Sequence, residues 1–141
     1  MIIVTGSAGF IGSCLVSELN YLGYHNLILV DDFSNHKKNK NLKNSKFHKK
    51  IDRNHFIDWF SNNYKDISFL FHLGARTDTS ELDTSIFKYL NLNYSKALYR
   101  ICVKFNIPFV YASSAATYGM GEFGFDDNHE KISSLLPLNP Y

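Results

Sequence analysis

Three glycines near the N-terminus constrain the fold of this chain more than any other feature. Gly6, Gly9 and Gly12 follow an apolar, β-branched run over residues 1–4, and apolar residues with helical spacing continue over residues 10–22. Strand, glycine turn and helix in this order are typical of a unit that binds a dinucleotide. Glycine permits the tight turn, the approach of a pyrophosphate to the backbone, and close packing of helix on sheet. The free N–H groups of the helix N-terminus would face the phosphates.

A carboxylate after the next strand supports the same interpretation. Residues 26–30 predict a second buried strand, and Asp31 follows it nineteen residues after Gly12. A carboxylate at this place accepts hydrogen bonds from an adenosine ribose and repels a 2′-phosphate, which favours NAD. Lys37 and Lys38 lie close behind and favour NADP. The residues alone leave the choice between the two cofactors open.

A basic tract follows this strand. Between His36 and Lys50 there are seven lysines and no acidic residue, although the formal net charge of the whole chain is only +2. The tract is consistent with a solvated loop or with phosphate contact by one or two lysines. A nucleic-acid patch is the third interpretation, but the tract contains no arginine and a single aromatic residue, Phe47. We therefore expect no nucleic-acid partner.

The third clear strand is nearly continuous in its apolar character. Residues 67–72 suit a central parallel strand, and small residues follow over 73–77. His72 at the end of this strand could be a catalytic base, but a hydrogen-bonded structural role is the better interpretation. Arg76 is placed to reach an anionic ligand or is a plain surface arginine.

Strands and helices alternate through the rest of the chain. Helices are expected over residues 52–63 and 85–106, a strand over 109–112, and a further short strand near Phe47. Such alternation predicts an α/β fold with a doubly wound parallel sheet. Asn91 and Asn93 interrupt the second helical pattern, and one of them is expected to hold a strand end or a cofactor. Hydroxyl side chains over residues 113–118 are candidates for binding a substrate alcohol or carbonyl.

The bulk properties agree with one globular domain. The chain has 141 residues, is 45% hydrophobic, and has no apolar run long enough to span a bilayer. We expect no signal peptide, no membrane partner, no metal site, and a reducing cytoplasmic location. Cys14 and Cys102 lie in helical patterns and are expected to be buried small hydrophobic residues.

Six segments in this order resemble the extended short-chain dehydrogenase/reductases, the NAD-dependent epimerase/dehydratase family. They are TGSAGFIG (5–12), Asp31, FHLGA (71–75), N-x-N-Y (91–94), YASSAATYG (111–119) and PLNPY (137–141). Within that family, HLGARTDTSE and ASSAATYG are most similar to the group that epimerises ADP-glyceromanno-heptose at carbon 6 in lipopolysaccharide core synthesis. The resemblance implies that residues 1–141 form an NAD(P)-binding Rossmann domain, the N-terminal part of a longer enzyme.

The resemblance also implies roles for individual residues. Ser114 and Tyr141 correspond to catalytic positions, where the tyrosine removes the hydroxyl proton and the serine binds the same oxygen. Lys38 corresponds to the lysine that holds the 2′-phosphate, which favours NADP, with NAD possible. The positions that correspond to cofactor contacts are Gly6, Gly9, Phe10, Ile11, Gly12, Asp31, Asp32, Lys38, Arg53, Leu73, Gly74, Ala75, Arg76, Thr77 and Asn91.

The implied reaction is epimerisation of a nucleotide sugar, ADP-heptose, through a transient keto intermediate, by hydride transfer to and from NADP. The family pattern places a lysine four residues after Tyr141, beyond the last residue of this chain, so we expect the chain by itself to be inactive. The whole enzyme is expected to form a homo-oligomer. Three alternatives remain: an NAD-dependent UDP-sugar 4-epimerase or nucleotide-sugar dehydratase, a catalytically dead NADP-binding fragment, and a nucleic-acid binder.

Overall fold

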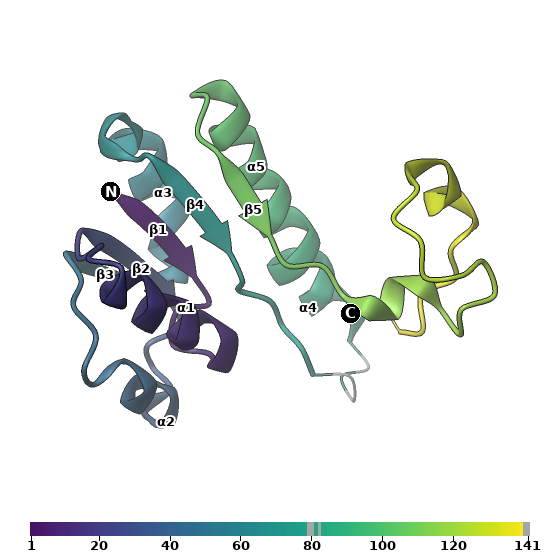
Figure 1. The fold of residues 1–141 in the computed structure, drawn as a ribbon, viewed down its shortest axis with the longest axis horizontal. Coiled ribbons are helices and arrows are strands. Elements are labelled where there is room, and N and C mark those ends of the chain that lie inside the picture. Colours follow the sequence, from purple (N-terminus) through teal and green to yellow (C-terminus); the bar gives the residue numbers. More distant parts are fainter. Residues whose placement is uncertain (79–80, 82, 140–141) are drawn as a thin grey trace.

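A computed structural model describes residues 1–78, 81 and 83–139. In it a five-stranded sheet has the order β3-β2-β1-β4-β5, with every pair of neighbours parallel. The doubly wound parallel sheet that the sequence predicts is therefore confirmed. The order reverses next to β1, because the chain builds outward first to β2 and β3 and then to β4 and β5 (Figure 1). The strands are β1 (Ile2–Thr5), β2 (Leu27–Asp31), β3 (Lys49–Asp52), β4 (Phe69–His72) and β5 (Phe109–Tyr111).

Helices cover both faces of the sheet. The α-helices are α1 (Phe10–Tyr21), α2 (His36–Asn39), α3 (Arg53–Asn63), α4 (Thr84–Phe87) and α5 (Tyr94–Lys104). Short 3₁₀ turns are η1 (Lys40–Leu42), η2 (Tyr64–Asp66), η4 (Ala115–Tyr118) and η5 (His129–Ser134), and η3 (Lys88–Asn93) is a π-helix. In Figure 1, α1 lies in front of the sheet, and α3 and α5 lie behind it.

Two apolar clusters, one on each face, hold these layers together. Val4 and Leu29 pack with Val16 of α1, whereas the neighbouring positions Ile3 and Val30 pack with Phe56 and Phe60 of α3 and Leu98 of α5. Successive side chains of a strand point to opposite faces, so one apolar run supplies both clusters.

The bounds of β3 and α3 differ from the sequence expectation by a few residues. The short strand expected near Phe47 is β3, which begins at Lys49, and the helix expected from residue 52 begins at Arg53. Asp52 ends the strand and caps α3, since its carboxylate accepts a hydrogen bond from the backbone N–H of Asn54 at 2.9 Å. Strand and helix therefore meet without a loop between them.

The helical stretch expected over residues 85–106 is not one regular helix. It begins at Thr84 and passes through the π-helical segment Lys88–Asn93 before α5 continues to Lys104. Single π-helical turns inside α-helices occur often at functional sites. This wide turn contains Asn91, and Asn93 ends it.

The segment after β5 leaves the sheet. Residues 112–139 contain the turns η4 and η5 and extend away from the layers, at the right of Figure 1. Cys102 is buried, but Cys14 is exposed on α1, so the expectation of two buried cysteines was wrong for Cys14. In the part of the chain that the structure describes, every helix is too short or too polar to cross a membrane.

Candidate functional site

The three glycines of the turn between β1 and α1 have different reasons to lack a side chain. Gly6 has φ +66°, and a Cβ atom there would lie 2.7 Å from the Cα of Gly74. A Cβ atom on Gly12 would lie 2.0 Å from the carbonyl oxygen of Gly6. At Gly9 the nearest described atom is the same oxygen at 3.2 Å, and φ is −70°, which any residue adopts. The fold itself therefore demands Gly6 and Gly12 much more strongly than Gly9.

Gly9 faces a cavity of about 380 Å³ at the carboxyl ends of the strands. The N-terminus of α1 opens into it, and no side chain among the described residues caps this helix end. Every residue assigned to cofactor contact by sequence lines this cavity except Asp32 and Asn91. The lining residues are Thr5, Gly6, Gly9, Phe10, Ile11, Gly12, Val30, Asp31, Lys38, Arg53, Leu73, Gly74, Ala75, Arg76, Thr77, Leu90 and Tyr94.

Asp31 connects the second strand to the glycine turn. Its carboxylate accepts hydrogen bonds from the backbone N–H groups of Ala8 and Asp32, both at 2.8 Å, and the residue is buried. Asp31 therefore fixes the glycine turn, and its carboxylate forms part of the cavity wall.

Asp32 lies just outside this cavity and binds two other side chains. It accepts hydrogen bonds from the hydroxyl of Ser34 at 2.6 Å and from the guanidinium of Arg53 at 3.1 Å. The hydrogen bond from Ser34 keeps the pKa of Asp32 below its ordinary value, and the charges of Arg53 and Lys38 act in the same direction. Asp32 is therefore ionised at neutral pH and holds Arg53 against the cavity.

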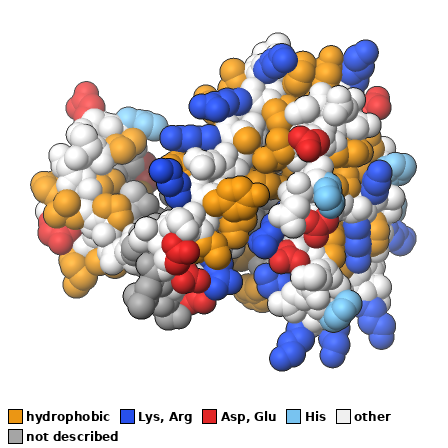
Figure 2. All heavy atoms as spheres, turned by 180° about the vertical axis from the view of Figure 1, so that it is seen from behind, with side chains coloured by type: hydrophobic (Ala, Val, Ile, Leu, Met, Phe, Trp, Pro, Cys, Tyr) orange, Lys and Arg blue, Asp and Glu red, His pale blue; other side chains and the backbone are white. Residues whose placement is uncertain are grey.

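Cationic side chains line the cavity on both sides. Lys38 comes from the basic tract, whose exposed lysines project from α2 and η1 at the lower right of Figure 2. Among the described residues, the buried Nε atoms of Arg53 and Arg76 have no hydrogen-bond partner. Buried donors of this kind are normally paired, so two unpaired guanidinium donors beside a helix N-terminus suit an anionic ligand such as a phosphate.

Arg76 is more constrained than its sequence position suggests. Its guanidinium forms ion pairs with Asp78 at 3.0 Å and Glu81 at 3.4 Å. Its backbone N–H donates to the side-chain oxygen of Asn91 at 2.7 Å, and its carbonyl accepts from the Asn91 amide at 3.0 Å. An asparagine of the helical stretch was expected to hold a strand end or a cofactor, and Asn91 instead holds the backbone four residues past the end of β4. It lies against the loop after β4, outside the first cavity.

A second, larger cavity of about 870 Å³ lies beside the first, between β4, β5 and the helical stretch 84–104. Gly74 and Ala75 line both cavities, and Ser114 lines the second. The Ser114 hydroxyl accepts a hydrogen bond from the backbone N–H of Ala116 at 3.2 Å, which begins η4. Tyr141, the other residue assigned to catalysis by sequence, lies outside the described residues.

His72 forms hydrogen bonds through both ring nitrogens, as expected for a hydrogen-bonded structural role, and it also lines the second cavity. Its Nδ1 lies 2.6 Å from the Thr5 hydroxyl and its Nε2 lies 2.7 Å from the Ser95 hydroxyl. Burial lowers the pKa of His72 to about 4, so the ring is neutral at pH 7.

Sequence reasoning did not assign Tyr94, which lines the first cavity. Its hydroxyl donates to the backbone carbonyl of Arg53 at 3.1 Å and so ties α5 to the start of α3. The sequence signal for Tyr94 was its position in the N-x-N-Y motif, directly after Asn93.

Comparison with known proteins gives consistent relatives. The model of the NAD dependent epimerase/dehydratase family matches residues 2–141. An ADP-L-glycero-D-manno-heptose-6-epimerase from Fusobacterium nucleatum is 39% identical over 145 residues, which cover 100% of this chain and 44% of that protein. The chain thus spans less than half the length of this curated relative.

Solved structures give the same picture of the fold. The crystal structure of an ADP-L-glycero-D-manno-heptose-6-epimerase from Helicobacter pylori matches with a TM-score of 0.77 at 24% identity, over 99% of this chain and 46% of the other. UDP-glucuronic acid 4-epimerase from Bacillus cereus, in complex with NAD, matches with a TM-score of 0.76 at 26% identity. That match covers 99% of this chain and 47% of the other.

Proposed function

Because the chain belongs to the NAD dependent epimerase/dehydratase family, we propose that its first cavity binds a nicotinamide dinucleotide and prefers NADP. One observation carries the proposal: a glycine turn and a helix N-terminus share one cavity with Lys38 and with the unpaired guanidinium donor of Arg53. The turn suits a pyrophosphate, and the cations suit a further phosphate. The solved relative that contains NAD supports the nicotinamide class in general.

We propose a place in the cavity for each part of the ligand. In our proposal the pyrophosphate lies against Gly9 and the backbone of Phe10 and Ile11. The adenosine lies towards the end of β2, where Asp31 and Asp32 face its ribose. Lys38 and Arg53 bind the 2′-phosphate. The residues Leu73, Gly74, Ala75, Arg76 and Thr77 line the path of the other half of the dinucleotide, and Asn91 supports them through the backbone of Arg76.

We further propose that the whole protein is a nucleotide-sugar epimerase that acts on ADP-heptose at carbon 6. The curated relative of that name matches along the complete chain, although the chain spans only 44% of it. The second cavity is the proposed sugar site, where the Ser114 hydroxyl would hydrogen-bond the reacting oxygen and Tyr141 would take its proton. A bound nicotinamide would supply removal and return of hydride at the carbon that bears this oxygen.

Reversing the charge of Lys38 tests the cofactor preference. Calorimetric titration should show tighter binding of NADP(H) than of NAD(H), and Lys38→Glu should weaken NADP(H) binding by at least tenfold while it changes NAD(H) binding little. Loss of one charge-assisted phosphate contact costs about 1.5–3 kcal/mol. Lys43→Glu is the matched control, since Lys43 is an exposed residue of the same tract outside the cavity.

Equal effects of Lys38→Glu and Lys43→Glu would contradict a specific phosphate contact and leave only the general charge of the tract. Tighter binding of NAD(H) than of NADP(H) would favour the second candidate, an NAD-dependent UDP-sugar 4-epimerase or dehydratase. The observation in favour of that candidate is the carboxylate of Asp31 in the cavity wall, because a carboxylate there repels a 2′-phosphate.

A further inference from the structure

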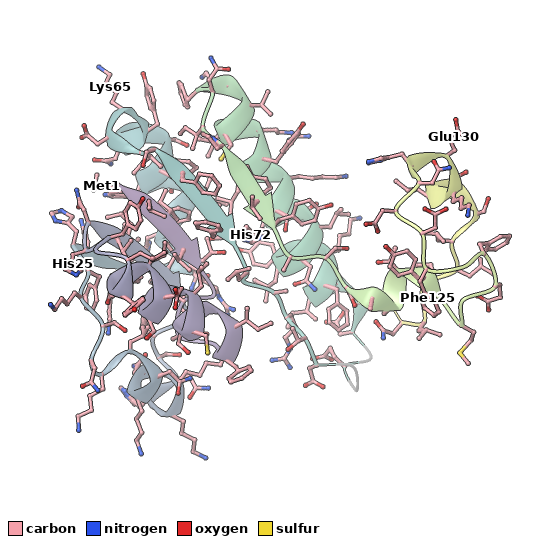
Figure 3. The ribbon with its side chains drawn as sticks, in the orientation of Figure 1. Met1, His25, Lys65, His72, Phe125 and Glu130 are labelled. Carbon is pink, nitrogen blue, oxygen red and sulfur yellow. The ribbon has the colours of Figure 1, made fainter. Side chains whose placement is uncertain are left out.

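A chain of hydrogen bonds runs beneath the boundary between the two cavities. The backbone N–H of Gly74 donates to the Thr5 hydroxyl oxygen at 3.2 Å. That hydroxyl lies 2.6 Å from Nδ1 of His72, and Nε2 of His72 lies 2.7 Å from the hydroxyl of Ser95. The chain therefore joins β1, the loop after β4, β4 itself and α5. Figure 3 labels His72 at the carboxyl end of β4, beside α5.

Each ring nitrogen of His72 faces one hydroxyl group in this chain. The Thr5 hydroxyl accepts from Gly74 and still has a hydrogen and a second acceptor lone pair for Nδ1 of His72. The neutral imidazole carries one hydrogen, so it donates through one ring nitrogen and accepts through the other. The ring centroids of Tyr94 and Phe109 lie 6.0 and 6.1 Å from that of the imidazole, and the burial of His72 favours its neutral form. His72 thus links β1, through Thr5, to α5, through Ser95.

Gly74, at one end of this chain, sits directly against the glycine turn. A Cβ atom on Gly6 would lie 2.7 Å from the Cα of Gly74, and a Cβ atom on Gly74 would lie 3.1 Å from the Gly6 nitrogen. Gly74 also lines both cavities. In a doubly wound sheet a dinucleotide lies across the point where the strand order reverses, here between β1 and β4. A dinucleotide in the first cavity must therefore pass over Gly74 to reach the second.

We propose that His72 is a positioning residue for the dinucleotide: through Thr5 it keeps Gly74 against Gly6 and so shapes the crossing between the two cavities. The inference rests on the proposed function. The inference predicts different effects on the two halves of the dinucleotide. The adenosine half lies on the β2 side of the glycine turn and does not touch Gly74, whereas the nicotinamide half must cross it.

Two ligands distinguish this role from general support of the fold. Calorimetry of the whole chain with NADPH and with 2′,5′-ADP, which lacks the nicotinamide half, should give different results for His72→Leu. We expect NADPH binding to weaken at least tenfold and 2′,5′-ADP binding to stay within twofold. His72→Asn should restore most of the NADPH affinity, because its amide can take the place of Nδ1 and pair with the Thr5 hydroxyl as donor or acceptor.

Thr5→Val tests the same link without altering His72, since it removes the hydroxyl and keeps the shape of the side chain. It should reproduce the selective loss of NADPH binding, and it keeps the test decisive should His72→Leu fail to fold. Ser68→Ala is the control, because it removes an exposed hydroxyl before β4 that donates to the Met1 carbonyl, away from Thr5 and His72.

Each other outcome overturns the inference. Equal losses for the two ligands would make His72 a support of the fold alone, and so would identical behaviour of His72→Asn and His72→Leu. Unchanged NADPH binding in Thr5→Val would exclude the path through Thr5. A wild-type chain that binds neither ligand would refute the proposed function itself and the inference with it.

Discussion

At the scale of single residues, the three equally spaced glycines are required for different physical reasons. Gly6 needs a positive φ and contact with Gly74, and Gly12 needs contact with the Gly6 carbonyl. Gly9 has an ordinary φ and a single close neighbour among the described atoms. Gly9 therefore meets no positive-φ requirement, and the space beside it is left for a ligand.

Alanine at two of these glycines should separate folding from binding. Gly12→Ala should lower the free energy of unfolding by about 1–3 kcal/mol, because its Cβ would overlap the Gly6 carbonyl. The cost of this overlap exceeds the gain from the better helix propensity of alanine. Gly9→Ala should change that free energy by less than about 1 kcal/mol, yet lower nucleotide affinity at least tenfold. Urea unfolding and calorimetry measure the two effects, and Gly23→Ala, remote from the cavity, is the binding control. A Gly9→Ala chain with parental affinity would mean that the glycines serve the turn alone.

At the scale of elements, the side chains of the cavity are held at junctions where one element passes directly into the next. Asp52 ends β3 and caps α3, so Arg53, the first residue of the helix, is held beside Asp32 and Lys38. The π-helical turn Lys88–Asn93 similarly carries Asn91, which binds the backbone of Arg76. Helical periodicity in the sequence predicts neither arrangement, because the π-helical turn is accompanied by hydrogen bonds between Asn91 and the distant backbone of Arg76.

Removal of the cap on α3 should lower both the stability of the fold and the affinity of the cavity for NADP(H). Asp52→Ala should lower the free energy of unfolding by about 1 kcal/mol, the usual cost of losing an N-cap acceptor. It should also weaken NADP(H) binding several-fold because Arg53 loses its fixed place. Asp52→Asn retains an acceptor for the N–H of Asn54 and should keep most of both properties. Equal defects in the two variants would point to the charge of Asp52 instead of its capping role.

At the scale of the whole molecule, a neutral histidine inside the sheet makes folding depend on pH. Burial lowers the pKa of His72 from 6.5 to about 4, so the unfolded chain binds its proton at a higher pH than the folded chain. The free energy of unfolding therefore falls as pH drops below about 6.5, and the loss is complete near pH 4.

This dependence is measurable by urea unfolding. Between pH 7 and pH 5 the wild-type chain should lose about 2 kcal/mol through His72, since each pKa unit corresponds to about 1.4 kcal/mol. His72→Asn has no such titration, and its free energy of unfolding should change correspondingly less over the same interval. Parallel pH profiles for the two chains would show that His72 is not buried in its neutral form.

The amino-acid sequence by itself determined the parallel α/β class, the glycine turn and most of the residues that line the first cavity. The fold class and the turn follow from apolar periodicity and glycine sterics, which act over a few neighbouring residues. Most of the cavity-lining residues were instead implied by the family resemblance of the motifs that carry them. Tertiary structure alone decided that Arg76 is held by two carboxylates, that Asn91 binds a backbone instead of lining the first cavity, and that Thr5, His72 and Ser95 form one chain. Asp78 and Glu81 lie only two and five residues from Arg76. The other partners are 15 to 67 residues apart in sequence, and they meet only because the crossovers and the register of the strands bring them to one edge of the sheet.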